Sequence, residues 1–93
     1  MYIIVVYDVA NSEKEGQRIL SKLFKLCKRF LNPVQKSVFE GDLSESELAR
    51  LKSEVDKLIR VDEDSVIIFR ANNEKWLSKE VLGRKDTQPS NLI

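Results

Sequence analysis

The chain has 93 residues, enough for one domain, and its formal net charge of +1 does not by itself indicate a class of partner. Histidine is absent and Cys27 is the only cysteine, which excludes a Ser-His-Asp triad, a Cys-His pair, an imidazole zinc site and an internal disulfide. No stretch approaches the roughly 18 apolar residues that span a membrane and the N-terminus lacks signal-peptide features, so we expect a cytoplasmic protein.

The first predicted element is a strand over residues 2–7, where β-branched and aromatic residues form an unbroken apolar run. Asp8 follows this run directly and is the only charge in the first twelve positions. A carboxylate at the carboxyl end of a buried strand lies where such folds tend to place ligands. Asp8 equally suits a structural role in the turn at residues 9–11, and its position alone does not decide between the two.

A helix is predicted to begin near Ser12, because Ser12 and Glu15 have the spacing of a capping box. It continues to Phe30 or Leu31, since the residue before Pro33 avoids the helical region. The spacing of its apolar residues predicts one buried face, made of Leu20, Leu23, Phe24, Cys27, Phe30 and Leu31.

Residues 34–39 are predicted to be a strand that Gly41 breaks, and the pattern leaves open whether 33–43 is one bent strand or two short ones. Alternation would place Gln35, Ser37 and Phe39 on one face of the sheet. A hydroxyl and an amide there could contact a metal-bound water or a phosphate, or could form ordinary cross-strand pairs.

A second helix is predicted from Ser44, with Glu47 completing a capping box, and a further strand over residues 65–70. The acidic residues Glu45, Glu47, Glu54, Asp56 and 62–64 suit a solubilising surface better than a cation site. Residues 80–83 are a candidate edge strand, and residues 84–93 form a polar tail that frays or pairs with a partner chain.

The order of these elements predicts an α+β ferredoxin-like βαββαβ domain over residues 1–83, with both helices on one face of the sheet. The chain has no further helix to cover the other face. We therefore expect a second copy of the chain to cover it, as a homodimer.

Basic residues gather on one stripe of the first helix, opposite its apolar face. No acidic residue occurs between Glu15 and Glu40, whereas ordinary solvated helices intersperse acids with lysines. The retained like charges favour an anionic partner such as RNA or DNA over a merely solvated surface. The predicted nucleic-acid-binding residues are Arg18, Lys22, Lys25, Arg29 and, from the second strand region, Lys36.

Asp8 is also the candidate metal ligand. Mg²⁺ prefers oxygen ligands and often takes only one or two carboxylates, with water and substrate phosphates completing its shell. Two copies that meet across a two-fold axis would supply a pair of Asp8 carboxylates. Magnesium, or another divalent metal, held there would polarise a phosphodiester and activate water in a protein without histidine.

The chain resembles the CRISPR-associated adaptation proteins of the Cas-two family over nearly its whole length. The residues that carry the resemblance are Val5-Val6-Tyr7-Asp8 at the end of the first strand, Arg18 on the first helix, the run Val34-Gln35-Lys36-Ser37-Val38-Phe39-Glu40, and the later Glu80-Val81-Leu82-Gly83.

The resemblance implies a homodimer with two sheets packed face to face and a divalent metal held by Asp8 between the protomers. It implies a metal-dependent endonuclease that acts on single-stranded RNA or duplex DNA, with Asp8 and Ser37 catalytic and Tyr7, Gln35 and Phe39 in support. It also implies a part in spacer integration together with the adaptation integrase. The alternatives are a non-catalytic adaptor that bridges integrase copies on DNA, and a generic RNA-binding module.

Overall fold

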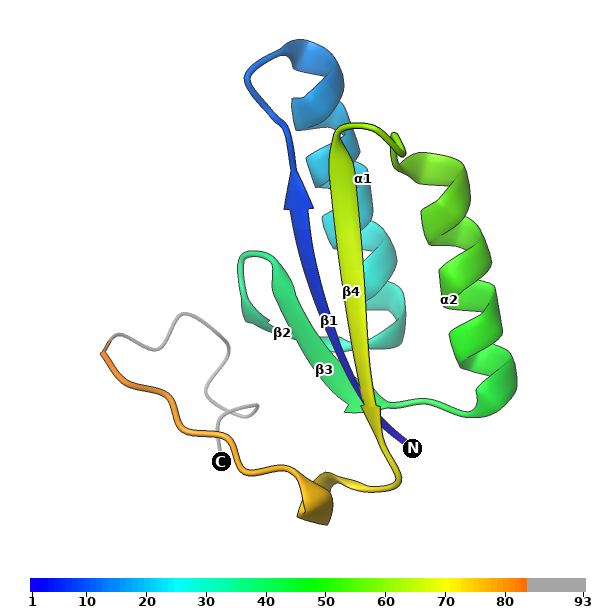
Figure 1. The fold of residues 1–93 in the computed structure, drawn as a ribbon, viewed down its shortest axis with the longest axis vertical. Helices are drawn as coiled ribbons and strands as arrows, with labels where there is room; N and C mark the ends of the chain where they lie inside the picture. The colour runs from blue at the N-terminus through cyan, green and yellow to red at the C-terminus, as the bar shows by residue number, and fades with distance from the viewer. Residues whose placement is uncertain (84–93) are drawn as a thin grey trace.

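The structure, a computed structural model, describes residues 1–83 of the chain. A four-stranded antiparallel sheet carries two helices on one face (Figure 1), in the order β1 (Tyr2–Val9), α1 (Lys14–Phe30), β2 (Asn32–Gln35), β3 (Val38–Asp42), α2 (Glu45–Leu58) and β4 (Asp64–Ala71). The strand order β2-β3-β1-β4 confirms the predicted ferredoxin-like βαββαβ topology. No helix in this part of the chain is long and apolar enough to cross a membrane.

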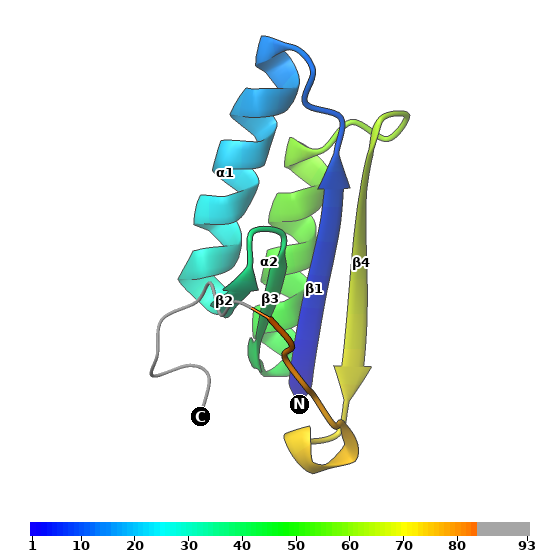
Figure 2. The ribbon, with the colours of Figure 1, turned by 90° about the vertical axis from the view of Figure 1, so that its left-hand side faces the viewer.

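Strand β1 is a central strand of the sheet, and its side chains alternate between the two faces. Alternation turns Ile3, Val5 and Tyr7 toward the helices, where all three are buried. The intervening residues point to the other face, which we call the outer face (Figure 2). The register pairs these outer-face residues with those of β4, as Ile4 with Phe69, Val6 with Ile67 and Asp8 with Ser65.

Helix α1 begins at Lys14, two residues later than the predicted start at Ser12. Its N-cap is Glu13, which makes no side-chain capping hydrogen bond, so the predicted capping box does not form. The chain leaving β1 passes so close to the helix that a Cβ on Gly16 would lie 1.9 Å from the carbonyl oxygen of Ala10. The glycine therefore lets the connection after β1 pack on the first turn of α1.

The buried face of α1 is rotated from the predicted one. Leu23 and Cys27 are buried as expected, but Ile19 and Leu26 complete the buried face instead of Leu20 and Phe24. Leu20, Phe24 and Phe30 are only partly buried, at the margin of the core. This rotation leaves apolar side chains accessible on one side of the helix.

Residues 32–42 form two short strands joined by a turn at Lys36-Ser37, which answers the question that the sequence left open. Gly41 lies within β3 opposite Ile3 and does not break the strand. The predicted shared face of Gln35, Ser37 and Phe39 is wrong, because the turn interrupts the alternation. Phe39 is fully buried in the core, whereas Gln35 is exposed on the edge strand.

Helix α2 confirms its predicted capping box. The Ser44 hydroxyl accepts from the Glu47 backbone N–H at 3.1 Å, and the Glu47 carboxylate accepts from the Ser44 N–H at 2.9 Å. These hydrogen bonds hold the pKa of Glu47 below its usual range. Leu48, Leu51 and Val55 form the apolar face of the helix and are buried in the core.

The segment after β4 contains a short 3₁₀ turn, Glu74–Trp76, and residues 77–83 form no strand, so the edge strand expected over residues 80–83 is absent from the described chain. This segment makes one strong contact with the outer face, where Lys79 Nζ donates to Glu40 Oε2 at 2.6 Å. Tyr2 donates its hydroxyl to the other oxygen of Glu40. The predicted tail, residues 84–93, lies outside the described residues.

Candidate functional site

Asp8 lies on the outer face of the sheet, at the carboxyl end of β1. Its side chain is exposed and stands opposite Ser65 of β4. The neighbouring outer-face positions are apolar, and Ile67 and Phe69 are 52% and 56% exposed. Among the described residues, Asp8 is thus an exposed carboxylate at the end of an apolar surface of the kind that often marks an interaction site.

A buried ion pair fixes the backbone just after Asp8. The carboxylate of Asp64 accepts from Arg60 Nε at 3.0 Å, from Arg60 Nη2 at 2.9 Å and from the Ala10 N–H at 3.2 Å. Arg60 Nη2 also donates to the Ala10 carbonyl oxygen at 2.7 Å. The Arg60 guanidinium beside Asp64 holds the pKa of that carboxyl below its usual range.

This pair was not predicted from the sequence, where the acidic residues at 62–64 were expected to form a solubilising surface. The Asp64 side chain is fully buried, and Arg60 also contacts Glu13 at 3.2 Å. The pair therefore joins the connection after β1 to the connection before β4, at the end of the sheet where Asp8 lies. An aspartate directly before a strand, with an arginine four positions earlier, was the available clue in the sequence.

One copy of the chain does not provide a complete metal site. Within residues 1–83, no group of three or more histidine, cysteine, aspartate or glutamate side chains could hold a metal ion. The exposed carboxylate of Asp8 has the oxygen chemistry that Mg²⁺ prefers, and it faces a surface open to a second chain. The residues present therefore fit half of a divalent-metal site, which a second copy would complete.

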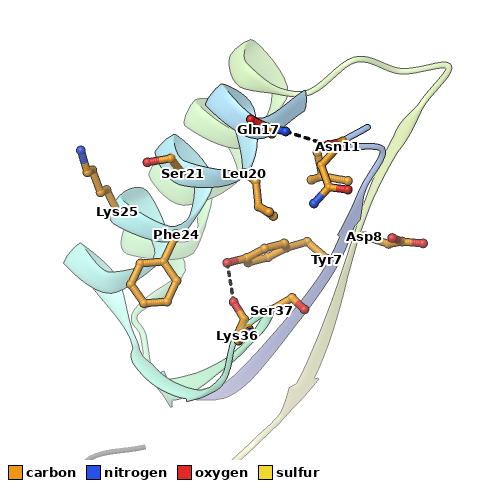
Figure 3. A pocket seen from close by; sticks show the side chains of 11 residues that line it. Tyr7, Asp8, Asn11, Gln17, Leu20, Ser21, Phe24, Lys25, Lys36 and Ser37 are labelled. Carbon is orange, nitrogen blue, oxygen red and sulfur yellow. Dashed lines mark hydrogen bonds between the residues drawn. The ribbon is translucent and has the colours of Figure 1, made fainter. Parts of the chain in front are cut away.

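A pocket of about 620 Å³ lies on the helix side of β1, between α1, the end of β1 and the turn that joins β2 to β3. Figure 3 shows Tyr7 pointing into it, whereas the Asp8 carboxylate points away toward the outer face. The residues that line the pocket are Tyr7, Asp8, Val9, Asn11, Gln17, Leu20, Ser21, Phe24, Lys25, Lys36 and Ser37.

Tyr7 is held rigidly at the inner wall of this pocket. Its hydroxyl donates to the carbonyl oxygen of Lys36 at 3.0 Å, and its N–H donates to the carbonyl oxygen of Ser37 at 3.1 Å. The Tyr7 ring stacks on Phe39 with centroids 6.1 Å apart. Burial raises the pKa of Tyr7 above its usual range, so this phenol stays protonated and acts as a structural donor.

The predicted site residues therefore separate into two groups. Asp8 is on the outer face, whereas Tyr7 and Ser37 line the pocket on the helix side (Figure 3). Phe39 supports Tyr7 from the core, and Gln35 is exposed on the edge strand β2. The hydroxyl of Ser37 is not brought to the carboxylate of Asp8 by any hydrogen bond within residues 1–83.

The basic stripe lies on the exposed side of α1, in the helix layer. Arg18 is paired with Glu15 at 3.1 Å, which leaves it less available than its neighbours. A groove of about 320 Å³ between α1 and α2 is lined by the other three members of the stripe, together with Leu26, Glu54, Lys57 and Leu58. Lys25 lines both this groove and the pocket, so the stripe continues toward Lys36 at the pocket's other side.

The stripe and Asp8 occupy opposite sides of the two-layer fold. A helix alone is about 10 Å thick, so the stripe of one copy is at least that far from the outer face. A strand of nucleic acid held on the stripe would have to pass around the edge of the sheet to meet Asp8. The geometry of one chain does not place a phosphodiester between the two.

Comparisons with known proteins agree over nearly the full chain. Residues 1–79 match the family model described as CRISPR associated protein Cas2. The chain is 50% identical over 93 residues to the CRISPR-associated endoribonuclease Cas2 of Fusobacterium nucleatum, covering 100% of this chain and 87% of that protein. It is 34% identical to the protein of the same name from Methanosarcina acetivorans, over 100% of both chains.

The fold matches solved structures as well. The crystal structure of Streptococcus pyogenes Cas2 superimposes with a TM-score of 0.81 at 29% identity, covering 89% of this chain and 100% of that one. The similarity thus extends from sequence to fold.

Proposed function

The chain belongs to the CRISPR-associated Cas2 family, and from this we propose that it is a divalent-metal-dependent endoribonuclease that hydrolyses phosphodiesters of single-stranded RNA. The relatives named CRISPR-associated endoribonuclease Cas2 support the reaction class. The observation in this chain that carries the proposal is the exposed carboxylate of Asp8 at the end of an open apolar sheet face.

A homodimer through the outer face is part of the proposal. Ile67 and Phe69 are exposed on this face beside Ile4 and Val6, and a chain of this size gains much from covering such a surface. A two-fold axis through the outer face would let the two Asp8 carboxylates approach each other. The pair would then bind one Mg²⁺ with oxygen ligands.

Three parts of the chain have defined roles in the proposed reaction. Asp8 would bind and orient the metal, which would supply charge stabilisation at the phosphate and activate water. The Arg60–Asp64 pair positions the backbone that follows Asp8 through its bonds to Ala10. We keep Ser37 as a candidate for hydrogen bonding to a substrate phosphate from the β2–β3 turn, because it lines the pocket beside Tyr7.

The test compares cleavage of labelled single-stranded RNA and duplex DNA by the wild type and by Asp8→Ala, with Mg²⁺ and with EDTA. The matched control is Asp42→Ala, because Asp42 is also exposed but stands at the opposite end of the sheet, across from Tyr2. We expect Asp8→Ala and EDTA each to remove activity by at least about a hundredfold, while Asp42→Ala stays active. An Asp8→Ala dimer that cuts at the full rate would overturn the assignment.

The second candidate function is a non-catalytic adaptor that binds DNA and bridges copies of the adaptation integrase in spacer integration. The observation that favours it is the separation of the basic stripe from Asp8 on opposite sides of the fold. Magnesium-independent duplex binding that needs Lys22 and Arg29 but not Asp8, in a protein without nuclease activity, would support the adaptor instead.

A further inference from the structure

The apolar interior of the pocket on the helix side of β1 has no role in the metal chemistry proposed for Asp8. The Asp8 carboxylate points away from it, so the pocket contains no acidic group directed inward (Figure 3). Its volume of about 620 Å³ lies within the range of small-molecule sites, which are mostly apolar with a few polar groups that orient the ligand.

We propose that this pocket takes one unstacked base of a single-stranded nucleic acid, while the flanking phosphates bind Lys25 and Lys36. The inference rests on the proposed function, because it requires that a nucleic acid occupies this surface. It adds a binding site on the helix side of the sheet and a reason for preferring single strands over duplexes.

The inner wall of the pocket suits a planar apolar ring. Phe24 is only partly buried and is fixed edge-to-face on Phe39, with centroids 5.2 Å apart. Leu20 is partly buried beside it, and Tyr7 is held by its hydrogen bond to Lys36. Rigid aromatic and aliphatic surfaces of this kind bind unstacked bases in single-stranded nucleic-acid sites.

The polar groups at the mouth of the pocket suit the edge of a base. Gln17 and Ser21 come from α1 and Asn11 from the connection before it, and together they offer amide and hydroxyl groups that both donate and accept. Within residues 1–83, the Gln17 side chain makes a single long hydrogen bond, from Nε2 to the Asn11 carbonyl oxygen at 3.5 Å. It can therefore turn toward a ligand at little cost.

The charge around the pocket selects a phosphate-bearing ligand. Lys25 and Lys36 line it from opposite sides, and within residues 1–83 neither lysine makes an ion pair. Lys25 also continues into the groove with Lys22 and Arg29, which gives a strand of phosphates a path away from the pocket. A base in the pocket and phosphates on the rim satisfy both the apolar lining and the charge.

The first experiment titrates the wild-type protein with uridine 5′-monophosphate and adenosine 5′-monophosphate, in EDTA, and follows backbone amide shifts by NMR. Ribose 5-phosphate is the control ligand, because it has the phosphate but no base. We expect the nucleotides to shift Leu20, Ser21 and Phe24 and the control to shift mainly the lysines. Equal shifts with ribose 5-phosphate would show that the site binds phosphate alone and would overturn the base assignment.

The second experiment fills the pocket. Ser21→Trp places a large side chain at the mouth, and Ser53→Trp is the matched control, because Ser53 is also an exposed helical serine but lies on α2. We expect Ser21→Trp to weaken binding of a short oligouridylate roughly tenfold while leaving duplex DNA binding unchanged. Equal affinity of the two variants for the oligouridylate would overturn the inference.

The experiments can overturn the nuclease proposal and the base-binding proposal independently of each other. Base-dependent shifts in the wild type without any RNA cleavage would overturn the nuclease and keep the pocket. Cleavage that depends on Asp8, with no difference between Ser21→Trp and Ser53→Trp, would overturn the pocket and keep the nuclease. If Ser21→Trp does not fold, as judged by circular dichroism, the nucleotide titration of the wild type decides alone.

Discussion

The two faces of the sheet differ in what they pack against. On the inner face, Ile3, Val5 and Phe39 are completely buried under the helices. On the outer face, Ile67 and Phe69 remain more than half exposed, although they lie in the same sheet and are equally apolar. The inner face therefore contributes mainly to the stability of the fold, whereas the described residues leave apolar surface open on the outer face.

This difference between the two faces bears on the role of Asp8, which lies on the outer face. A carboxylate on the inner face would be buried among helices, but on the outer face it is free to meet a partner or a metal. The helix layer offers a second and different surface, with the pocket and the basic stripe. Our two proposals thus assign metal chemistry and the binding of a single-stranded base to opposite sides of one small domain.

The largest effect is expected from a substitution on the inner face. Phe39→Ala removes a fully buried ring that contacts both Tyr7 and Phe24, and it should lower the free energy of unfolding by about 3–5 kcal/mol. Phe69→Ala, the matched change on the outer face, should cost under about 1 kcal/mol in the monomer. Urea unfolding of both variants at low protein concentration measures the contrast. Equal losses would contradict the difference between the faces.

The next largest loss of stability is expected from weakening the Arg60–Asp64 ion pair, at the end of the sheet where Asp8 lies. Asp64→Asn weakens the bonds to Arg60 and Ala10 and should destabilise the protein by about 2–3 kcal/mol at pH 7. Because Asp64 has a lowered pKa when folded, its contribution is fully present above about pH 4 and is lost as the pH falls through the folded value. The difference between wild type and Asp64→Asn, measured by urea unfolding, should therefore shrink below about pH 4. A constant difference down to pH 2 would show that ionisation of Asp64 is irrelevant.

A smaller effect is expected where the C-terminal segment covers part of the outer face. Lys79→Ala removes the cation that contacts Glu40 and should cost about 1 kcal/mol, because the Lys79 side chain is partly exposed. Lys75→Ala is the control, because Lys75 is exposed and makes no ion pair within residues 1–83. Thermal unfolding should separate the two by a few degrees. An identical melting temperature would mean that this contact does not hold the segment.

The smallest effect on folding, and the most informative for the outer face, is expected from Ile67→Lys. The side chain is already 52% exposed, so the stability of the monomer should change by only about 0.5 kcal/mol. A charge on this apolar surface should nevertheless prevent association of two copies. Sedimentation of the wild type and of Ile67→Lys measures whether each protein forms a dimer. A variant that still forms a dimer would place the interface elsewhere.

The fold was predictable because runs of apolar residues and capping residues mark most of its strands and helices in the sequence. The apolar run before Asp8 and the capping box at Ser44 and Glu47 each gave an element that the structure confirms. The sequence left open whether a turn divides residues 33–43, because Lys36-Ser37 contains none of the glycine, asparagine or proline that usually marks a turn. The rotation of α1 was missed because apolar residues lie on more than one side of that helix.

The candidate site was predictable only in part. The sequence singled out Asp8 but not its face, because both Ile3 and Ile4 are apolar and the strand has no polar side to fix its orientation. It grouped Asp8 with Tyr7 and Ser37, which the fold separates across the sheet. The pocket formed by Leu20 and Phe24 depends on the rotation of α1, which no local pattern specified.

In the proposed reaction, catalysis requires two Asp8 carboxylates brought together across the outer face. The rate of Mg²⁺-dependent cleavage of single-stranded RNA by Ile67→Lys tests this requirement, because the variant keeps Asp8 but should be monomeric. We expect it to lose activity to the level of Asp8→Ala while its melting temperature stays close to that of the wild type. A monomeric Ile67→Lys protein that cleaves RNA at the wild-type rate per chain would contradict it.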